Sequence, residues 1–272
     1  MSEKAKEDKK FELFLIFMKG DTRVPDAFRW SLSIKSKVSA MEILYKEVLA
    51  QLPKCSDELK EIEKKGFGSA IECPILAIKY EVFLNSIYAL CENLSRVVRY
   101  LYHSKKLPES FRQQKSRFLK DLSLDSVYSN MLMATSWYDE VRAIRTEATH
   151  YLSGFITIPS PTELGYFNVP KSERRDTPKG ILINDVEKHI KRIYNDVFTF
   201  LSLFGNHFIT VINQDTRVVL PCLVISGLLG AKRISLREYL NNESGMCHTI
   251  NFDCPKKDSC EARRKAKKSK ST

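Results

Sequence analysis

The chain has 272 residues, of which 43% are apolar and 28% charged, so it can bury the core of one large domain or two modest ones. Its formal net charge of +11 favours a polyanionic partner, and nucleic acid is the natural candidate. The apolar stretches at 11–18 and 219–229 are shorter than the roughly 20 residues that cross a bilayer, and MSEKAKEDKK lacks a secretory apolar segment, so we expect a cytoplasmic protein without a membrane span.

The first hundred residues predict a short strand and then long helices. The run from Phe11 to Met18 is typical of a buried strand, and we expect residues 1–35 to form a charged leader that contains it. Apolar residues recur at helical spacing from Ser36 onward, and Pro53 is expected to end that helix. A long apolar helix is predicted from Pro74 to about Ser104.

Helices also dominate the second half. A basic helix is expected from Glu109 to about Leu119, and a further helix, capped by Ser123 or Asp125, is expected to run to Leu152. Residues 155–158 resemble a short strand.

The last elements complete a mainly α chain. Helical spacing returns from Asp185 to Phe208, and β-branched residues predict a strand from Val218 to Leu229. We expect a helical domain over 36–240, with a few short peripheral strands, and a basic cysteine-containing tail over 241–272.

The cysteines favour reduced thiols over a disulfide framework. Seven is an odd number, and four cysteines stand singly in apolar or mixed surroundings, at Cys55, Cys73, Cys91 and Cys222. In the tail, four further side chains could surround zinc, namely Cys247, His248, Cys254 and Cys260. Their spacing lacks a Cys-x-x-Cys pair, so we favour ordinary thiols there and expect no cofactor.

The segment WYDEVRAIRTEATHYLSG, from Trp137 to Gly154, places Arg145 and His150 on one amphipathic helix with four residues between them. An arginine holds phosphate through a planar fork of donors, and a histidine exchanges a proton near neutrality. Together they meet both needs of phosphodiester cleavage. At 100° per residue an apolar stripe enters the core, formed by Trp137, Val141, Ile144, Ala148 and Leu152.

Polar residues flank this stripe. Arg142 and Thr146 share an arc with His150, which would give the helix a positive face. A structural ion pair or a capping role for Arg145 and His150 is the alternative interpretation. Arg96 and His103 fit a looser version of the spacing, although His103 falls where the long helix is expected to end.

The segment resembles the signature of the HEPN superfamily, whose nuclease members carry an arginine, four to six residues and a histidine near a helix end. In that resemblance Arg145 and His150 take the motif positions, and Thr146 stands where many members have asparagine. The resemblance implies a helical, metal-independent endoribonuclease that cleaves RNA by 2′-hydroxyl attack and leaves a 2′,3′-cyclic phosphate. The alternative is a catalytically silent relative that binds nucleic acid or a partner protein.

Members commonly pair about a two-fold axis, which implies a homodimer, and a toxin or defence role implies an antitoxin or regulatory protein as partner. On the long helix Glu81 and Asn85 share one face with Glu92 and Arg99, and Glu81 or Asn85 could orient the catalytic pair. The alternative for this face is a solvated polar stripe. The tail offers a second cationic surface for RNA, with Arg263, Arg264, Lys265, Lys267 and Lys268.

Overall fold

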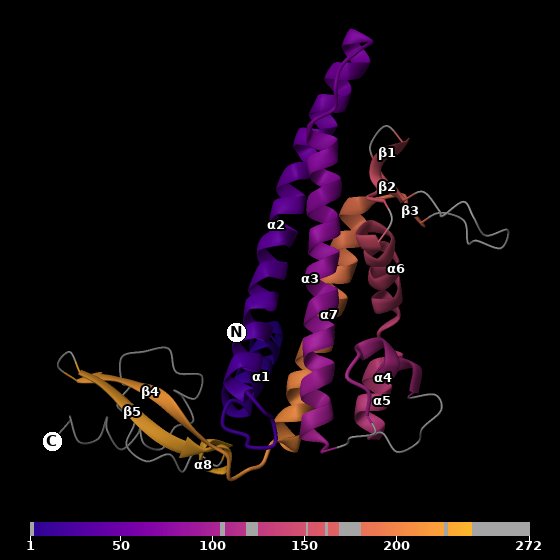
Figure 1. Cartoon of the computed structure of the whole chain (residues 1–272). Helices are drawn as coiled ribbons and strands as arrows, with labels where there is room; N and C mark the ends of the chain where they lie inside the picture. The colour runs from indigo at the N-terminus through magenta and orange to yellow at the C-terminus, as the bar shows by residue number, and fades with distance from the viewer. Residues whose placement is uncertain are drawn as a thin grey trace. The chain divides into compact units, whose positions relative to one another are not determined.

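The computed structural model describes residues 3–103, 107–117, 125–150, 152–160, 163–168, 181–225 and 228–240. Over these residues the chain is mainly helical, with a few short strands (Figure 1), and the predicted fold class is confirmed to this extent. The helices are α1 (Glu3–Met18), α2 (Ala27–Lys65), α3 (Glu72–Leu101), α4 (Phe111–Arg117), α5 (Ser126–Met133), α6 (Ser136–His150), α7 (Val186–Val211) and α8 (Leu236–Leu240). The strands are β1 (Phe155–Ser160), β2 (Glu163–Asn168), β3 (Ile181–Ile183), β4 (Arg217–Ile225) and β5 (Leu228–Ser235).

The chain divides into two compact units, and the division falls inside α2, α3 and α7. The first unit comprises residues 1–32, 97–105 and 201–272, and the second comprises 33–96 and 106–200. The domain limits expected from the sequence stay predictions.

In the first unit, the expected strand at 11–18 is wrong, because this segment is the end of α1. Phe11, Phe14, Leu15 and Met18 are all buried, at positions i, i+3, i+4 and i+7 of one helical face. The ring of Phe14 meets that of Phe204 edge to face, with centroids 5.4 Å apart. A short apolar run does not distinguish a strand from a buried helix, so packing decided its conformation.

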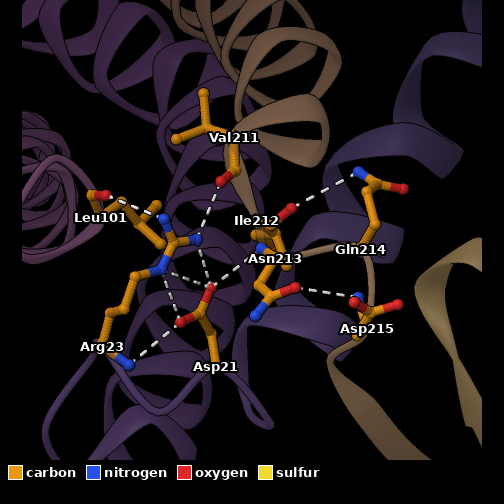
Figure 2. A network of polar contacts seen from close by, with 8 residues as sticks. All are labelled: Asp21, Arg23, Leu101, Val211, Ile212, Asn213, Gln214 and Asp215. Atoms are coloured by element: carbon orange, nitrogen blue, oxygen red, sulfur yellow. Dashed lines mark hydrogen bonds and ion pairs between the residues drawn. The ribbon is translucent and has the colours of Figure 1, made fainter.

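An ion pair joins the ends of three segments in the first unit (Figure 2). Nη2 of Arg23 donates to Oδ2 of Asp21 at 2.6 Å, and Nε donates to Oδ1 at 2.9 Å. The same guanidinium donates to the carbonyl oxygens of Leu101 and Val211, at 3.2 and 2.8 Å, where α3 and α7 end. Asp21 also accepts from the Asn213 amide at 3.3 Å. Arg23 therefore supplies donors to terminal carbonyls that their own helices leave unsatisfied.

The strand expected at 218–229 is one half of a hairpin, in which β4 pairs with β5 in antiparallel register. The sequence pattern missed β5. The tail from 241 onward lies outside the described residues.

In the second unit, α2 does not end at Pro53 as expected but continues to Lys65. Leu52 and Cys55 on either side of the proline are buried, and this packing outweighs the backbone hydrogen bond that proline removes. The expectation that Cys55 and Cys73 are reduced is also wrong. They form a disulfide between α2 and α3, with Cα atoms 5.1 Å apart and 18 residues of separation, whereas Cys91 is free and buried.

The long helix predicted from Pro74 is confirmed as α3, which begins two residues earlier. By length and composition alone it could cross a membrane, but half of its most apolar window is buried, and a core helix passes the same test. Leu84, Ile87 and Leu94 are fully buried within it.

The helix expected up to Leu152 is divided into α5 and α6. Asp125 caps α5 as predicted, because its Oδ1 accepts from the amides of Val127 and Tyr128. Leu152 was expected in the buried stripe, yet it is 55% exposed because α6 already ends at His150. A three-stranded antiparallel sheet in the order β1-β2-β3 follows α6.

Candidate active site

Helix α6 is held against α3 by aromatic and polar contacts. Trp137, Val141 and Ile144 of the predicted apolar stripe are buried, together with Tyr138, whereas Ala148 of that stripe is half-buried. The ring of Tyr138 stacks beside that of Tyr88, with centroids 6.0 Å apart, and its hydroxyl donates to Oε1 of Glu92 at 3.2 Å. At the edge of this packed face Arg145 is half-buried beside α3, and His150 at the end of α6 is exposed.

Arg145 and His150 contact each other near the end of α6. Nη1 of Arg145 lies 3.4 Å from Nε2 of His150. Because a guanidinium can only donate, Nε2 is the accepting nitrogen in this contact. Both groups can be reached from solvent, since His150 is exposed and Arg145 is half-buried. The 140° that separates them on the helix wheel is bridged by the length of the arginine.

Two residues of α3 orient Arg145. Nε of Arg145 donates to Oδ1 of Asn85 at 3.4 Å, and the guanidinium carbon lies 4.7 Å from the centre of the Tyr88 ring. Asn85 was among the residues expected to contact the pair. Tyr88 was not, although it lies one helical turn beyond Asn85 on α3. The guanidinium is thus fixed at its Nε edge and on one face.

Glu81 was expected to contact the pair. Its carboxylate instead bonds to residues that follow α6 in the chain. Its Oε1 accepts from the Gly154 amide and from the Tyr166 hydroxyl, both at 2.7 Å. Nδ2 of Asn168 donates to the carbonyl of Leu152 at 2.7 Å. These contacts define the path of the chain at Leu152 and Gly154. A methyl group at Gly154 would overlap the Tyr166 ring, so this close approach requires glycine.

The sequence pattern did not identify Tyr166 and Asn168 as site residues, because the composition of their segment predicts only an irregular connection between helices. Burial raises the pKa of Tyr166, and its hydrogen bond to Glu81 acts in the same direction. The hydroxyl therefore stays protonated and donates to the carboxylate.

The remaining predicted residues are dispersed. Arg142 and Thr146 are half-buried on α6, and Nε of Arg142 is buried with no hydrogen-bond partner among the residues that the structure describes. The rival histidine, His103, follows the end of α3 with a φ of 48°. Two predicted sets lie outside the described residues: the cationic group Arg263, Arg264, Lys265, Lys267 and Lys268, and the candidate zinc ligands Cys247, His248, Cys254 and Cys260.

A second histidine lies inside the second unit, away from solvent. Nδ1 of His189 lies 2.9 Å from the Tyr80 hydroxyl, and Nε2 lies 3.2 Å from Oε2 of Glu140. Glu140 also accepts from Nη2 of Arg192 at 2.5 Å. Burial lowers the pKa of His189, and its contact with Glu140 only partly opposes this. The imidazole therefore joins α3, α6 and α7 as a neutral, buried group.

A cleft that the described residues form in the second unit is separate from the pair. It has a volume of about 890 Å³ and lies between α2, the β1–β2 hairpin and the start of α7, and neither Arg145 nor His150 lines it. Comparisons with family models, with curated proteins and with solved structures give no match for this chain. The chemistry available at the pair is that of its own groups: a fixed cation that can stabilise an oxyanion, next to an imidazole that can accept or donate a proton.

Proposed function

We propose that the protein is a HEPN-like, metal-independent endoribonuclease in which Arg145 and His150 are the catalytic residues. The observation that carries the proposal is the 3.4 Å contact between a guanidinium and an imidazole on an open surface of α6. Phosphodiester cleavage by a 2′-hydroxyl needs a proton acceptor and a cation at the phosphorus oxygens, and these two side chains supply both.

The contact also suggests the order of events. In the absence of RNA, Nη1 of Arg145 occupies the lone pair of His150 Nε2. A phosphate is a better partner for the guanidinium, because the pair is charge-assisted and can be bidentate. When Arg145 turns to the phosphate, Nε2 becomes able to accept the 2′-hydroxyl proton, and the products carry a 2′,3′-cyclic phosphate and a 5′-hydroxyl.

The leaving 5′-oxygen needs a proton that His150 of the same site has not yet released. A second histidine from a two-fold related copy supplies it, so the proposal includes a homodimer. It also places the protein in the cytoplasm, acting on RNA as a toxin or defence component, with an antitoxin or regulatory protein as a partner.

The contacts of Arg145 favour one other function. Its guanidinium already rests on Tyr88 and bonds Asn85, as expected of a residue that builds a surface rather than one that acts in a reaction. The second candidate is therefore a non-catalytic HEPN-like module that binds nucleic acid or a partner protein through the same face of α6.

Cleavage of mixed RNA in excess EDTA tests the proposal. The wild type should cut, and His150→Asn and Arg145→Ala should each slow cleavage about 100-fold or more with unchanged far-UV circular dichroism. Arg96→Ala and His103→Asn are matched controls, because both residues are exposed and asparagine tolerates the positive φ at 103. They should cut like the wild type.

Three outcomes contradict the proposal: activity that EDTA removes, equal cutting by the His150 and Arg145 variants, or RNA binding without any cutting. The last result would favour the binding module. If deletion of residues 256–272 abolished that binding, the tail rather than α6 would be the RNA-contacting part.

A further inference from the structure

The small sheet after α6 has two different faces. Phe155, Phe167 and Leu182 lie directly opposite one another on β1, β2 and β3, so their side chains share one face. The next row, with Ile156, Tyr166 and Ile183, lies on the other face, and Tyr166 there is fully buried.

The first row is apolar yet solvent-exposed. Phe155 is 47% exposed and Leu182 is 55% exposed, and Phe167 between them is half-buried. The rings of Phe155 and Phe167 meet edge to face, with centroids 5.4 Å apart. The solvent face of an antiparallel sheet is normally polar, so an exposed aromatic pair here indicates a binding surface. We call this row, Phe155, Phe167 and Leu182, the aromatic face.

The aromatic face begins close to the Arg145 and His150 pair. Phe155 is five residues after His150, so an extended chain can separate them by at most about 17 Å. Glu81 and Asn168 bond to Gly154 and Leu152, and Figure 1 shows the sheet next to the end of α6. A single strand of a few nucleotides can contact both places.

We propose that the aromatic face binds unpaired bases of an RNA strand whose phosphate lies at Arg145 and His150, which makes single-stranded RNA the substrate class. This inference rests on the proposed function. Bases of any identity stack on an exposed phenyl ring, and aromatic side chains on neighbouring strands are a known arrangement for holding successive bases.

Charge supports a nucleic-acid occupant. Half-buried Arg145 and exposed His150 precede this face in the chain, with the half-buried acid Glu147 between them on α6. The acid on the β1–β2 hairpin, Glu163, is paired with Lys188, with Nζ 3.1 Å from Oε1. A phosphate backbone therefore meets the guanidinium of Arg145 at the pair, and the acid beyond it, Glu163, is already paired with a lysine.

Area argues against a second copy of the chain as the occupant. A stable protein interface covers about 800 Å² per partner. Three half-exposed side chains offer roughly 300 Å², since a large aromatic buries 150–250 Å² at most. This is enough for one or two bases but small for a subunit.

Binding of a labelled octauridylate, measured by fluorescence anisotropy in EDTA, tests the proposal. All proteins carry His150→Asn, so cleavage cannot interfere. Phe155→Leu keeps the apolar character but removes the ring, and it should weaken binding about 5-fold or more, whereas Phe155→Trp should bind at least as tightly as phenylalanine. Ile158→Ala is the matched control, because Ile158 is 56% exposed on the same strand but lines the cleft.

A duplex of equal length separates stacking from charge, because its bases are not free to stack. Phe155→Leu should leave duplex binding unchanged. Equal binding of octauridylate by the leucine and tryptophan variants would overturn the inference, and so would a loss in Ile158→Ala as large as that in Phe155→Leu. If Phe155→Asp converts a dimer into a monomer by light scattering while Phe155→Leu binds RNA normally, the face is a subunit interface instead.

These results are separate from the test of cleavage. Ring-dependent binding by a wild type that never cuts would contradict the nuclease proposal and leave the base-binding face standing. Cleavage that needs Arg145 and His150 but not Phe155 would do the reverse.

Discussion

The ion pair of Asp21 and Arg23 allows a quantitative test of how the first unit is held together. The Asp21 side chain is 1% exposed, and the Arg23 guanidinium satisfies both its carboxylate oxygens and the last carbonyls of two helices. Arg23→Met keeps a long unbranched side chain but removes every donor. The variant therefore leaves a buried carboxylate without its cation.

Breaking a buried ion pair in this way costs about 3–5 kcal/mol. The Arg23 side chain is 23% exposed, so water can replace part of what the guanidinium supplies, and we expect a loss near the lower limit, about 3 kcal/mol. Urea denaturation followed by circular dichroism measures the free energy of unfolding, and an unchanged m-value shows that the unfolding reaction is the same. Arg29→Met, at an exposed arginine of α2, should change it by less than about 0.5 kcal/mol.

The pH dependence gives an independent check. Burial acts to raise the pKa of Asp21, but the hydrogen bonds and charge of Arg23 outweigh it, so the pKa lies below the ordinary 3.8. A carboxyl with a lowered pKa stabilises the fold above pH 3.8, and this contribution is lost as pH falls through the folded-state value. Without Arg23 the buried carboxyl has a raised pKa, so acidification favours the variant. The difference between wild type and Arg23→Met should shrink from pH 7 towards pH 3.

A loss of less than about 1 kcal/mol in Arg23→Met at pH 7 would contradict this role of the ion pair, because a buried unpaired charge costs more than that. A difference between the two proteins that does not depend on pH would contradict it as well.

Three further predictions concern the second unit. Tyr166→Phe removes the hydroxyl between Glu81 and the chain after α6, and thermal denaturation should show a loss of about 1–2 kcal/mol; an unchanged melting temperature would mean that this hydrogen bond adds nothing. Reduction of the Cys55 and Cys73 disulfide opens an 18-residue separation and should cost about 3 kcal/mol, whereas alkylation of both thiols without a reductant would show that no disulfide forms. Because the folded-state pKa of His189 is lowered, the wild type should lose free energy of unfolding as pH falls below 6.5 towards that value, and His189→Gln should remove this slope; identical slopes would contradict a buried neutral imidazole.

Local patterns in the amino-acid sequence were sufficient for much of the fold. The long apolar helix, the Asp125 cap, and the burial of Trp137, Val141 and Ile144 on α6 all follow from spacing and capping chemistry that act within a few residues. The same spacing put Arg145 and His150 on one helix. Interactions of this range are encoded in neighbouring residues, so they can be read without the fold.

Contacts between distant segments could not be read in this way. The conformation of 11–18 depends on the rings of α7 that it meets, and Pro53 is tolerated inside α2 because its neighbours are buried. The disulfide joins residues that only the α2–α3 hairpin brings to 5.1 Å.

The surroundings of the candidate pair depend on the same kind of contact. Spacing could name Arg145, but its partner Asn85 is 60 residues away, and Glu81 meets Tyr166 across 85 residues. Such pairs follow from how α3, α6 and the small sheet pack, since each element alone leaves the partner's position free. Packing therefore determined which polar groups face one another, while periodicity determined which groups each helix could present.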